Sequence, residues 1–189
     1  FKAADGGVAH PITDEKTIYV LQGSLQTTVN GESVTLGAGD LASMPTGMLS
    51  NAGAPSDAVV IAWTAGSLTP GAAPAVVRGA DVKPGGNDML VLRRYDFPGN
   101  SVRVVTQRKG LKLGPNSAKT DSLIYITSGN EIFMEEGQNF QVTKGDFIRE
   151  VAGAMHGWDV TEESGFVTTS ALPIGAGPID PDKATDVPK

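Results

Sequence analysis

Short runs of β-branched and apolar residues alternate with glycine-containing turns along most of the chain. Within 18–40, an apolar run ends at Gly23, an alternating segment follows, and Asn30-Gly31 separates that segment from another. An Asn-Gly pair between alternating segments is the strongest short-range signal for a β-hairpin. Helical periodicity is almost absent, and the 24 glycines and 12 prolines interrupt the chain too often for helices. The pattern predicts an all-β protein of short antiparallel strands.

The same pattern occurs twice, with residue n of the first copy aligned to residue n + 106 of the second and no gap. The first copy reads "IYVLQGSLQTTVNGESVTLGAGD" and the second reads "IYITSGNEIFMEEGQNFQVTKGD". The identities that hold the two copies in register are Ile18, Tyr19, Gly23, Gly31, Gly39 and Asp40, which correspond to Ile124, Tyr125, Gly129, Gly137, Gly145 and Asp146. A repeat of this kind predicts two similar antiparallel β units, each a small barrel or sandwich.

The repeat divides the chain into an N-terminal unit over 1–68 and a C-terminal unit over 87–173. The segment 69–86 is rich in Pro, Gly and Ala, which predicts a linker between the units. The segment 174–189 has little apolar content and several prolines, which predicts an extended or loosely docked tail.

The two units differ before the repeat begins. Strand-like "MLVLRRYDF" and "SVRVVTQ" precede the second copy, whereas only 17 residues precede Ile18. We therefore expect the first unit to lack leading strands that the second unit has. An exposed sheet edge invites pairing, so we expect the second copy, the tail or another subunit to cover that edge. A homodimer or a larger homo-oligomer is predicted on this ground.

Composition excludes several classes of partner. The formal net charge is −6 and the sequence pI is about 4.8, which argues against binding to nucleic acid or to an anionic membrane surface. The basic residues between Arg93 and Lys112 alternate with strand-forming residues and are interpreted as solvated strand faces. No apolar run approaches the ~20 residues of a membrane-spanning helix. We expect a soluble chain with no nucleic-acid and no membrane partner.

The chain contains no cysteine, which excludes disulfides, thiolate zinc sites and a cysteine nucleophile. These features assign no cellular compartment. The chain begins at Phe1 rather than Met, so we expect that an upstream segment was removed, either as a cleaved signal or by the choice of chain boundary.

The glycine pattern resembles the cupin superfamily (RmlC-like), and its doubling resembles a bicupin. The second motif of that family runs Gly-Asp, four residues, Pro, one residue, Gly, two residues, His. The stretch "GDLASMPTGMLSN" matches it except that Ser50 replaces the His, and "GDFIREVAGAMHG" matches it except that Val151 replaces the Pro. The resemblance implies two tandem cupin-type antiparallel β-barrels, also described as double-stranded β-helices or jelly rolls.

In metal-dependent cupins the first motif supplies most of the metal ligands, as His, one residue, His, three residues, Glu. The corresponding positions are His10, Ile12 and Lys16 in the first copy and Asn116, Ala118 and Ser122 in the second. Each copy therefore keeps one histidine, His10 or His156, whereas a divalent metal requires several ligands that converge on it. We expect degenerate metal-binding motifs, no bound metal and no other cofactor.

His156 is the candidate catalytic residue. In the strand parity that the resemblance implies, it points into the second barrel with the other candidate ligand-binding residues, Asn116, Ser122, Ile124, Ile126 and Trp158. An apolar cavity with a few polar groups is typical of a small-molecule site, and an imidazole can act as a general acid or base near neutral pH. The alternative is an imidazole that only packs against Trp158 and bonds a backbone carbonyl.

The sequence leaves open whether His156 has a carboxylate partner. Glu131 and Phe133 share one strand face, and a pair of His156 with Glu131 is expected only if that face points inward. The pair Glu135-Glu136 is interpreted as part of a solvated turn. The charged residues expected to point outward are Lys119, Asp121 and Asp159.

Three functions are compatible with these features. The first is a metal-independent bicupin that binds a small organic molecule, such as a sugar or a carboxylate, in the C-terminal barrel, with isomerisation or another transformation left open. The second is a metal-dependent cupin lyase, isomerase or dioxygenase with displaced ligands. The third is a non-catalytic structural or storage role. The resemblance alone does not separate turnover from binding.

Overall fold

The computed structural model describes residues 10–11, 16–29, 31–44, 49–50, 52–64, 74–97, 100–117 and 119–171. Two compact units are present: unit 1 contains Phe1–Val82 and Phe97–Gly99, and unit 2 contains Lys83–Asp96 and Asn100–Lys189. Apart from one short 3₁₀ helix, η1 (Gly79–Asp81), the regular structure of the described residues is β-strand. The predicted all-β class is confirmed. Ile12, Ala118 and the predicted tail 174–189 lie outside the described residues.

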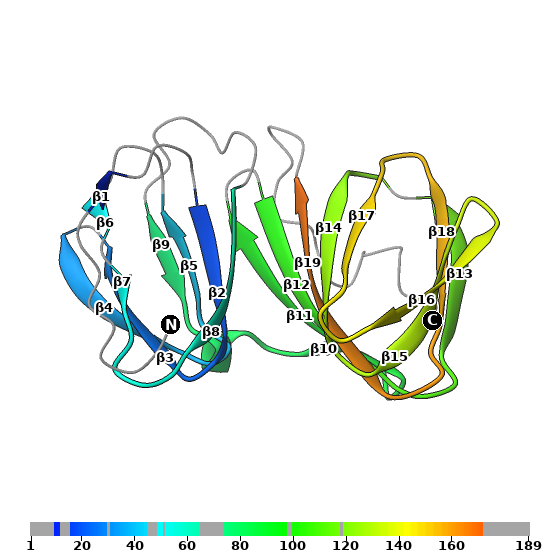
Figure 1. Ribbon diagram of the computed structural model, residues 1–189, viewed down its shortest axis with the longest axis horizontal. Helices are drawn as coiled ribbons and strands as arrows, with labels where there is room; N and C mark the ends of the chain where they lie inside the picture. The colour runs from blue at the N-terminus through cyan, green and yellow to red at the C-terminus, as the bar shows by residue number, and fades with distance from the viewer. Residues whose placement is uncertain are drawn as a thin grey trace. The chain divides into compact units, whose positions relative to one another are not determined.

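The strands of unit 1 form three antiparallel sheets (Figure 1). The largest has the order β8-β2-β5-β9, a second has the order β4-β3-β7, and β1 pairs with β6. The bounds are β1 (His10–Pro11), β2 (Lys16–Gln22), β3 (Ser24–Val29), β4 (Glu32–Gly37), β5 (Leu41–Met44), β6 (Leu49–Ser50), β7 (Ala52–Gly53), β8 (Val59–Thr64) and β9 (Ala75–Val77).

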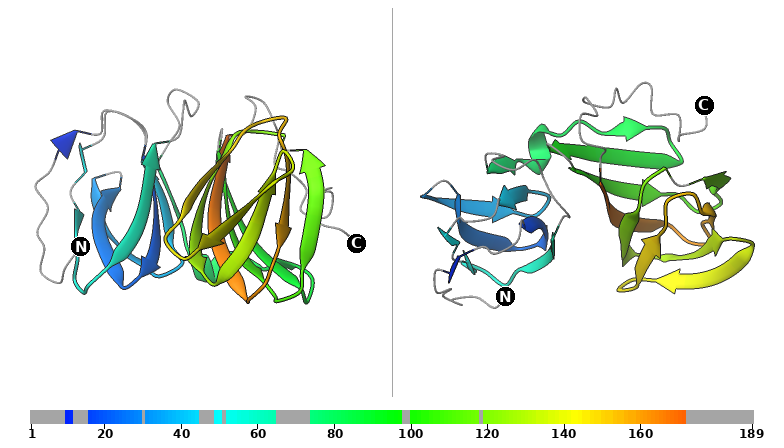
Figure 2. Two further views of the ribbon diagram at one scale, coloured as in Figure 1. Left: turned by 45° about the vertical axis from the view of Figure 1, so that its right-hand side comes forward. Right: turned by 90° about the horizontal axis from the view of Figure 1, so that it is seen from above.

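Unit 2 consists of a six-stranded sheet with the order β10-β11-β12-β19-β14-β17 and a four-stranded sheet with the order β13-β18-β15-β16. The two sheets face each other (Figure 1, Figure 2). The bounds are β10 (Gly85–Gly86), β11 (Leu90–Phe97), β12 (Asn100–Gln107), β13 (Lys112–Ser117), β14 (Ser122–Ser128), β15 (Asn130–Glu135), β16 (Gln138–Thr143), β17 (Phe147–Glu150), β18 (Met155–Asp159) and β19 (Ser164–Ala171). Strand pairing among the described residues joins the sheets of neither unit into a closed barrel.

The repeat in the sequence is also a repeat in the structure. Strands β14, β15, β16 and β17 have the bounds of β2, β3, β4 and β5 shifted by 106 residues. The Gly-Asp turns are closed by the same backbone bond, because Val20 N donates to Asp40 O and Ile126 N donates to Asp146 O, each at 3.0 Å. The same alternation of side chains therefore builds the same local structure twice.

The turn after the first repeated strand requires a glycine in both copies, Gly23 in unit 1 and Gly129 in unit 2. Gly23 and Gly129 adopt positive φ angles of 75° and 77°. A Cβ atom would lie 1.9 Å from the carbonyl oxygen of Asp57 at Gly23 and 2.2 Å from that of Glu163 at Gly129. Any larger residue would clash with the backbone at these two places and would also adopt a disfavoured conformation.

The segment predicted as a linker contains regular structure. Residues 75–77 form β9, which pairs with β5 so that Leu41 lies opposite Val77. Residues 85–86 form β10, which pairs with β11 in unit 2. Unit 1 thus extends its own sheet beyond β5 with a strand from the segment 69–86. The prediction of a linker over this segment did not include a strand. Proline and glycine content indicated a connection but did not show that a strand is embedded in it.

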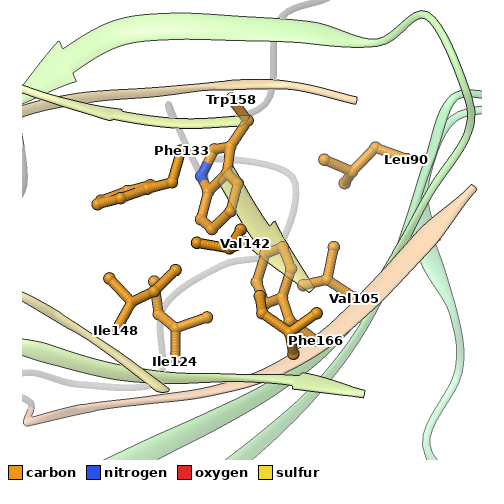
Figure 3. Packing of buried hydrophobic residues seen from close by; sticks show 9 residues of the cluster. Leu90, Val105, Ile124, Phe133, Val142, Ile148, Trp158 and Phe166 are labelled. Atoms are coloured by element: carbon orange, nitrogen blue, oxygen red, sulfur yellow. The ribbon is translucent and has the colours of Figure 1, made fainter. Parts of the chain in front are cut away.

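The interior of unit 2 is aromatic at its centre (Figure 3). The Trp158 ring lies 4.8 Å from the Phe133 ring and stacks on Phe166 at 5.2 Å between centroids. The buried residues that form this core are Leu90, Val105, Ile124, Ile126, Phe133, Val142, Ile148, Trp158 and Phe166. Burying one such side chain stabilises the fold by about 1.5–3 kcal/mol, so these residues hold the two sheets of the unit together.

The core of unit 1 is aliphatic, with Ile18, Val20, Leu25, Leu36, Ala42 and Met44 as its buried members. In unit 2, β17 is the last strand of its sheet among the described residues, and its Phe147 side chain is 66% exposed. Leu123, on the neighbouring strand β14, is 44% exposed.

The predicted homodimer or larger oligomer stays a prediction. Among the described residues, no helix combines the length and the apolar character needed to cross a membrane.

Candidate functional site

Polar residues occupy both ends of the unit 2 interior, with the aromatic core between them. Along β15, Glu131, Phe133 and Glu135 lie on one face, because side chains alternate along a strand. Phe133 belongs to the core, so Glu131 lies at one end of the interior and Glu135 at the other. The end that contains Glu135 also receives His156 from β18, since these two residues are register partners.

His156 faces a carboxylate across the interior. Its Nδ1 lies 3.2 Å from Oε1 of Glu150 on β17, and the two side chains are 19% and 10% exposed. Nδ1 makes no hydrogen bond within the described part of the chain, so the pair is a close contact rather than an aligned hydrogen bond. Ser122 is the register partner of Glu150 and hydrogen-bonds its carboxylate.

Several groups act on the pKa of Glu150. Burial raises this pKa above its ordinary value, and the negative charge of Glu135 raises it further. The charge of His156, the hydrogen bond with Ser122 and the charge of Arg103 oppose this increase, and the net direction is upward. A carboxyl group with a raised pKa beside an imidazole forms a pair that can hold and exchange a proton closer to neutral pH.

The structure corrects the interpretation of Glu135 as a residue of a solvated turn. Glu135 ends β15, and its Oε1 is buried without a hydrogen-bond partner among the residues that the structure describes. Glu136 does lie in the turn, where it has a positive φ of 48° and its Oε1 accepts a bond from Met155 N at 2.6 Å. Adjacent residues of a strand end point to opposite sides, so one glutamate faces inward and the other outward.

The structure places four of the predicted site residues in the interior. Ser122, Ile124, Ile126 and Trp158 are buried, and the last three belong to the core cluster. Asn116 is the register partner of His156 on β13, but it is exposed. The role of these residues in ligand binding stays a prediction.

The residues expected to point outward are found there. Asp121 is exposed, accepts a bond from Ala152 N at 2.8 Å and lies 3.5 Å from Arg149. Asp159 forms an ion pair with Lys112 at 2.7 Å. Lys119 is also exposed. These charges lie outside the interior that contains His156.

Glu131 points inward, which was the condition for a pair with His156. Its partner is nevertheless not His156. Glu131 is fully buried, and its Oε2 lies 3.0 Å from Ser164 Oγ at the opposite end of the interior. Burial raises the pKa of Glu131 to about 7, against the effect of the bond with Ser164. The carboxylate beside His156 is Glu150 instead. Alternation in "FIRE" was the signal, because an inward Ile148 requires an inward Glu150.

The corresponding positions in unit 1 are different in chemistry. At the offset of 106, Glu131, Glu135 and Glu150 correspond to Leu25, Val29 and Met44. All three unit 1 residues are buried. His10 is the register partner of Ser50, and at the corresponding positions of unit 2 Asn116 is the register partner of His156. The histidine is therefore on the first strand of this pair in unit 1 and on the second strand in unit 2.

The resemblance to cupins implies a metal, and the side chains described at the motif positions of unit 2 do not make up a set of ligands for one. The motif positions supply Asn116, Ser122 and a single imidazole from His156. In the described ranges, no group of three or more His, Asp or Glu side chains is arranged so that it could hold a metal ion. A structural or catalytic metal requires three or more converging ligands.

A family model of the cupin domain matches residues 3–64, about one third of the 189-residue chain. The match falls in unit 1. A search of curated proteins finds no match.

Solved structures match nearly the whole chain at low sequence identity. AerE from Microcystis aeruginosa is 10% identical with a TM-score of 0.76, and the match covers 92% of this chain and 85% of that one. Oxalate decarboxylase from Bacillus subtilis is 14% identical with a TM-score of 0.73 and coverages of 94% and 68%. Salicylate 1,2-dioxygenase from Pseudoaminobacter salicylatoxidans is 13% identical with a TM-score of 0.67 and coverages of 90% and 69%. The chain has the cupin fold, and the resemblance to the cupin superfamily is supported.

Proposed function

We propose that this cupin-fold chain is a bicupin with degenerate metal-binding motifs, and that unit 2 binds a small organic molecule without a metal. In this proposal each unit is a cupin barrel, and the ligand lies at the end of the unit 2 interior where His156 and Glu150 meet. The observation that carries the proposal is this pair at 3.2 Å, in which Glu150 is buried and His156 is partly buried. A partly buried imidazole whose Nδ1 has no hydrogen-bond partner among the described residues, beside a buried carboxylate, is typical of a site that is completed by its ligand.

The residues around the pair have distinct roles in the proposal. Ser122, Glu150 and His156 contact the polar groups of the ligand, and Ile124, Ile126 and Trp158 form the apolar surface beneath it. Asn116 lies at the rim, next to His156. Because Nδ1 of His156 faces Glu150, Nε2 is the ring atom available to the ligand.

This arrangement can move a proton as well as bind. Glu150 orients the imidazole, and the imidazole exchanges a proton with the ligand through Nε2. Hydrogen bonds of this kind are commonly long or poorly aligned before the ligand binds and become shorter in the complex. An isomerisation that moves one proton within the ligand requires no other cofactor, and it is the reaction to test once binding is established.

A sugar and a carboxylate are both ligands of the proposed kind. Carboxylates are tested first, because two of the structures that share the fold are named for enzymes of oxalate and salicylate. The imidazole of His156 supplies a donor for a carboxylate or a hydroxyl group. The glutamates nearby supply acceptors for hydroxyl groups.

The test is isothermal titration of the full chain with oxalate, salicylate, D-glucose and L-rhamnose. We expect one of these probes to bind in the millimolar range or tighter, and His156→Ala and Glu150→Gln to weaken binding at least tenfold. Glu32→Gln is the matched control for Glu150→Gln, because it makes the same charge change on an exposed strand of unit 1. We expect this control to bind as the unchanged chain does.

Three results would contradict the proposal. Normal binding by both His156→Ala and Glu150→Gln would place the ligand elsewhere. Elemental analysis of protein purified without added metal that finds near-stoichiometric Mn, Fe, Ni or Zn would favour the metal-dependent alternative, since the oxalate decarboxylase of similar fold is described with Mn(II) centres. Failure of every probe to bind would favour a structural role.

A further inference from the structure

Two arginines of unit 2 are placed on strand faces that line its interior. On β11, Leu90 belongs to the core and Leu92 packs against it, so Arg94 lies on the same face. On neighbouring β12, Val105 belongs to the core, which places Arg103 on the inner face too. These arginines were interpreted from the sequence as part of solvated strand faces, and the structure corrects that interpretation for both.

Arg94 is nine-tenths buried and incompletely bonded. Its side chain is 10% exposed, and its Nε donates to Asp96 Oδ1 at 2.7 Å. Its Nη2 is buried and has no hydrogen-bond partner in the part of the chain that the structure describes. Asp96 thus holds one edge of the guanidinium and leaves a donor directed elsewhere. A guanidinium presents its N–H groups as a fork that matches a carboxylate or a phosphate.

Ser101 adds a second incompletely bonded donor on the inner face of β12. It is fully buried, and its Oγ finds no hydrogen-bond partner among the described residues. Ser101 shares the parity of Arg103 and Val105. A buried donor without a partner is unfavourable unless a ligand or water completes it, because the group has lost its hydration.

The register of the six-stranded sheet connects this region to the proposed site. Ser101 lies opposite Ser170, Ser170 opposite Ser122, and Ser122 opposite Glu150. This row crosses four adjacent strands at one end of the sheet. Four adjacent strands span roughly 14 Å, since neighbours are ~4.8 Å apart. Ser101 and the pair of His156 with Glu150 therefore lie at the same end of the interior.

Arg103 lies one level deeper, in the row that passes through Thr168, Ile124 and Ile148. Its positive charge acts on Glu150, which places the guanidinium within electrostatic range of the proposed site. The β11–β12 hairpin precedes the repeated segment, so the alignment of the two copies does not include Arg94 or Arg103.

We propose that Arg94, Arg103 and Ser101 form an anion subsite that takes a carboxylate group of the ligand of unit 2. The carboxylate of the ligand then lies at the arginines, within the same interior as His156 and Glu150. This inference rests on the proposed function and narrows it, because a neutral sugar has no group for the arginines. Asp96 is a positioning residue that holds Arg94 through Nε.

The first experiment uses the unchanged chain and two matched probes, salicylate and salicylamide, which differ in charge but hardly in shape. We expect isothermal titration to show at least tenfold tighter binding of salicylate, and the same preference for oxalate over oxamide. Binding of the amide as tightly as the acid would overturn the subsite. Binding of D-glucose or L-rhamnose with no binding of either acid would also overturn it while leaving the proposed function intact.

The second experiment uses variants. Arg94→Gln should weaken salicylate binding at least tenfold and leave salicylamide binding unchanged, and Arg94→Lys should restore part of the loss. Arg93→Gln is the matched control, because it removes the same charge from the exposed neighbouring position. Salicylate binding by Arg94→Gln within twofold of the unchanged chain contradicts the inference. If Arg94→Gln does not fold, Arg94→Lys and Ser101→Ala decide, and normal salicylate binding by both is then the contradicting result. If no acid and no sugar binds at millimolar concentration, the subsite and the proposed function both fail.

Discussion

Units 1 and 2 share the repeated strands β2–β5 and β14–β17 but differ at several inward positions of those strands. Their repeated strands have identical bounds at the offset of 106. Where unit 2 has Glu131 and Glu150, unit 1 has Leu25 and Met44, and all four side chains are buried. The difference teaches that turns and alternation specify this scaffold, whereas the inward side chains can change from apolar to charged without altering the strand order.

The units also differ in how the sheet ends beyond the Gly-Asp turn. In unit 1, Asp40 accepts bonds from Gly79 N at 2.9 Å and Arg78 at 2.6 Å, which fasten the chain beside β9. In unit 2, Asp146 accepts a bond from Thr143 N at 2.8 Å, and β17 has no further strand beside it within the described ranges. Among the described residues, unit 1 therefore pairs β5 with its own chain, whereas no strand is described on the outer side of β17.

The largest expected effect tests the aromatic core of unit 2. Trp158→Ala removes the ring that stacks on Phe166 and contacts Phe133, and a buried Trp→Ala change lowers the free energy of unfolding by about 3–5 kcal/mol. Urea denaturation measures the loss, and hydrogen exchange should show it in unit 2. Phe147→Ala is the control, because this ring is 66% exposed. A loss below about 1 kcal/mol for Trp158→Ala would mean that unit 2 is not held by this core.

The next effect tests the buried carboxyl group that replaces a leucine. Glu131 has a pKa raised to about 7 in the folded chain, against an ordinary 4.5. Below pH 4.5 the carboxyl group of Glu131 is protonated in both the folded and the unfolded chain, so this group does not lower the stability of the folded chain. Between pH 4.5 and 7 the unfolded chain ionises first, and stability falls by up to about 3 kcal/mol at ~1.4 kcal/mol per pKa unit.

Glu131→Gln should remove this loss. The variant and the unchanged chain should have similar free energies of unfolding at pH 4, and the variant should gain up to about 3 kcal/mol relative to it by pH 8. Glu131→Leu introduces the residue that unit 1 has at Leu25, and it should likewise remove the loss of stability between pH 4.5 and 7. Urea denaturation across this pH range is the measurement, with Glu32→Gln as the exposed control. A constant difference across the range would contradict the raised pKa.

The smallest effect compares the two Gly-Asp turns. Asp40→Ala removes bonds to Gly37 N, Gly79 N and Arg78, and Asp146→Ala removes the one to Thr143 N. Hydrogen bonds to a charged group contribute about 1.5–3 kcal/mol, and losses within one cluster are not additive. We expect Asp40→Ala to lower the free energy of unfolding by about 2–3 kcal/mol and Asp146→Ala by about 1 kcal/mol less. Equal losses would mean that the contacts to Arg78 and Gly79 add nothing.

The pH dependence of Asp40 has the opposite sign to that of Glu131. Burial acts to raise its pKa, but the bonds from Gly37, Gly79 and Arg78 together hold the pKa below the usual 3.8. Its contribution is therefore present above pH 3.8 and is lost as the pH falls through the folded value. Asp40→Asn should flatten the stability profile only in that acidic range, whereas Glu131→Gln changes it between pH 4.5 and 7.

The sequence alone determined the all-β class, the two copies and their turns, because these depend on local rules. Positive φ at Gly23 and Gly129 and the alternation of neighbouring residues act within a few positions of the chain. The predicted inward orientation of Ser122, Ile124, Ile126 and Trp158 rested on the strand parity that the resemblance to cupins implies. The resemblance to cupins also came from such local patterns, and the family model matched residues 3–64 in unit 1.

Only the tertiary structure decided which charged groups meet. Glu150 and His156 belong to opposite sheets, and Arg103 stands on a strand that precedes the repeat, so no spacing along the chain records their proximity. The strand β9, hidden in a Pro- and Gly-rich segment, is likewise defined by its partner β5 rather than by its own three residues. Contacts across an interior depend on how sheets face each other, which local alternation constrains but does not specify.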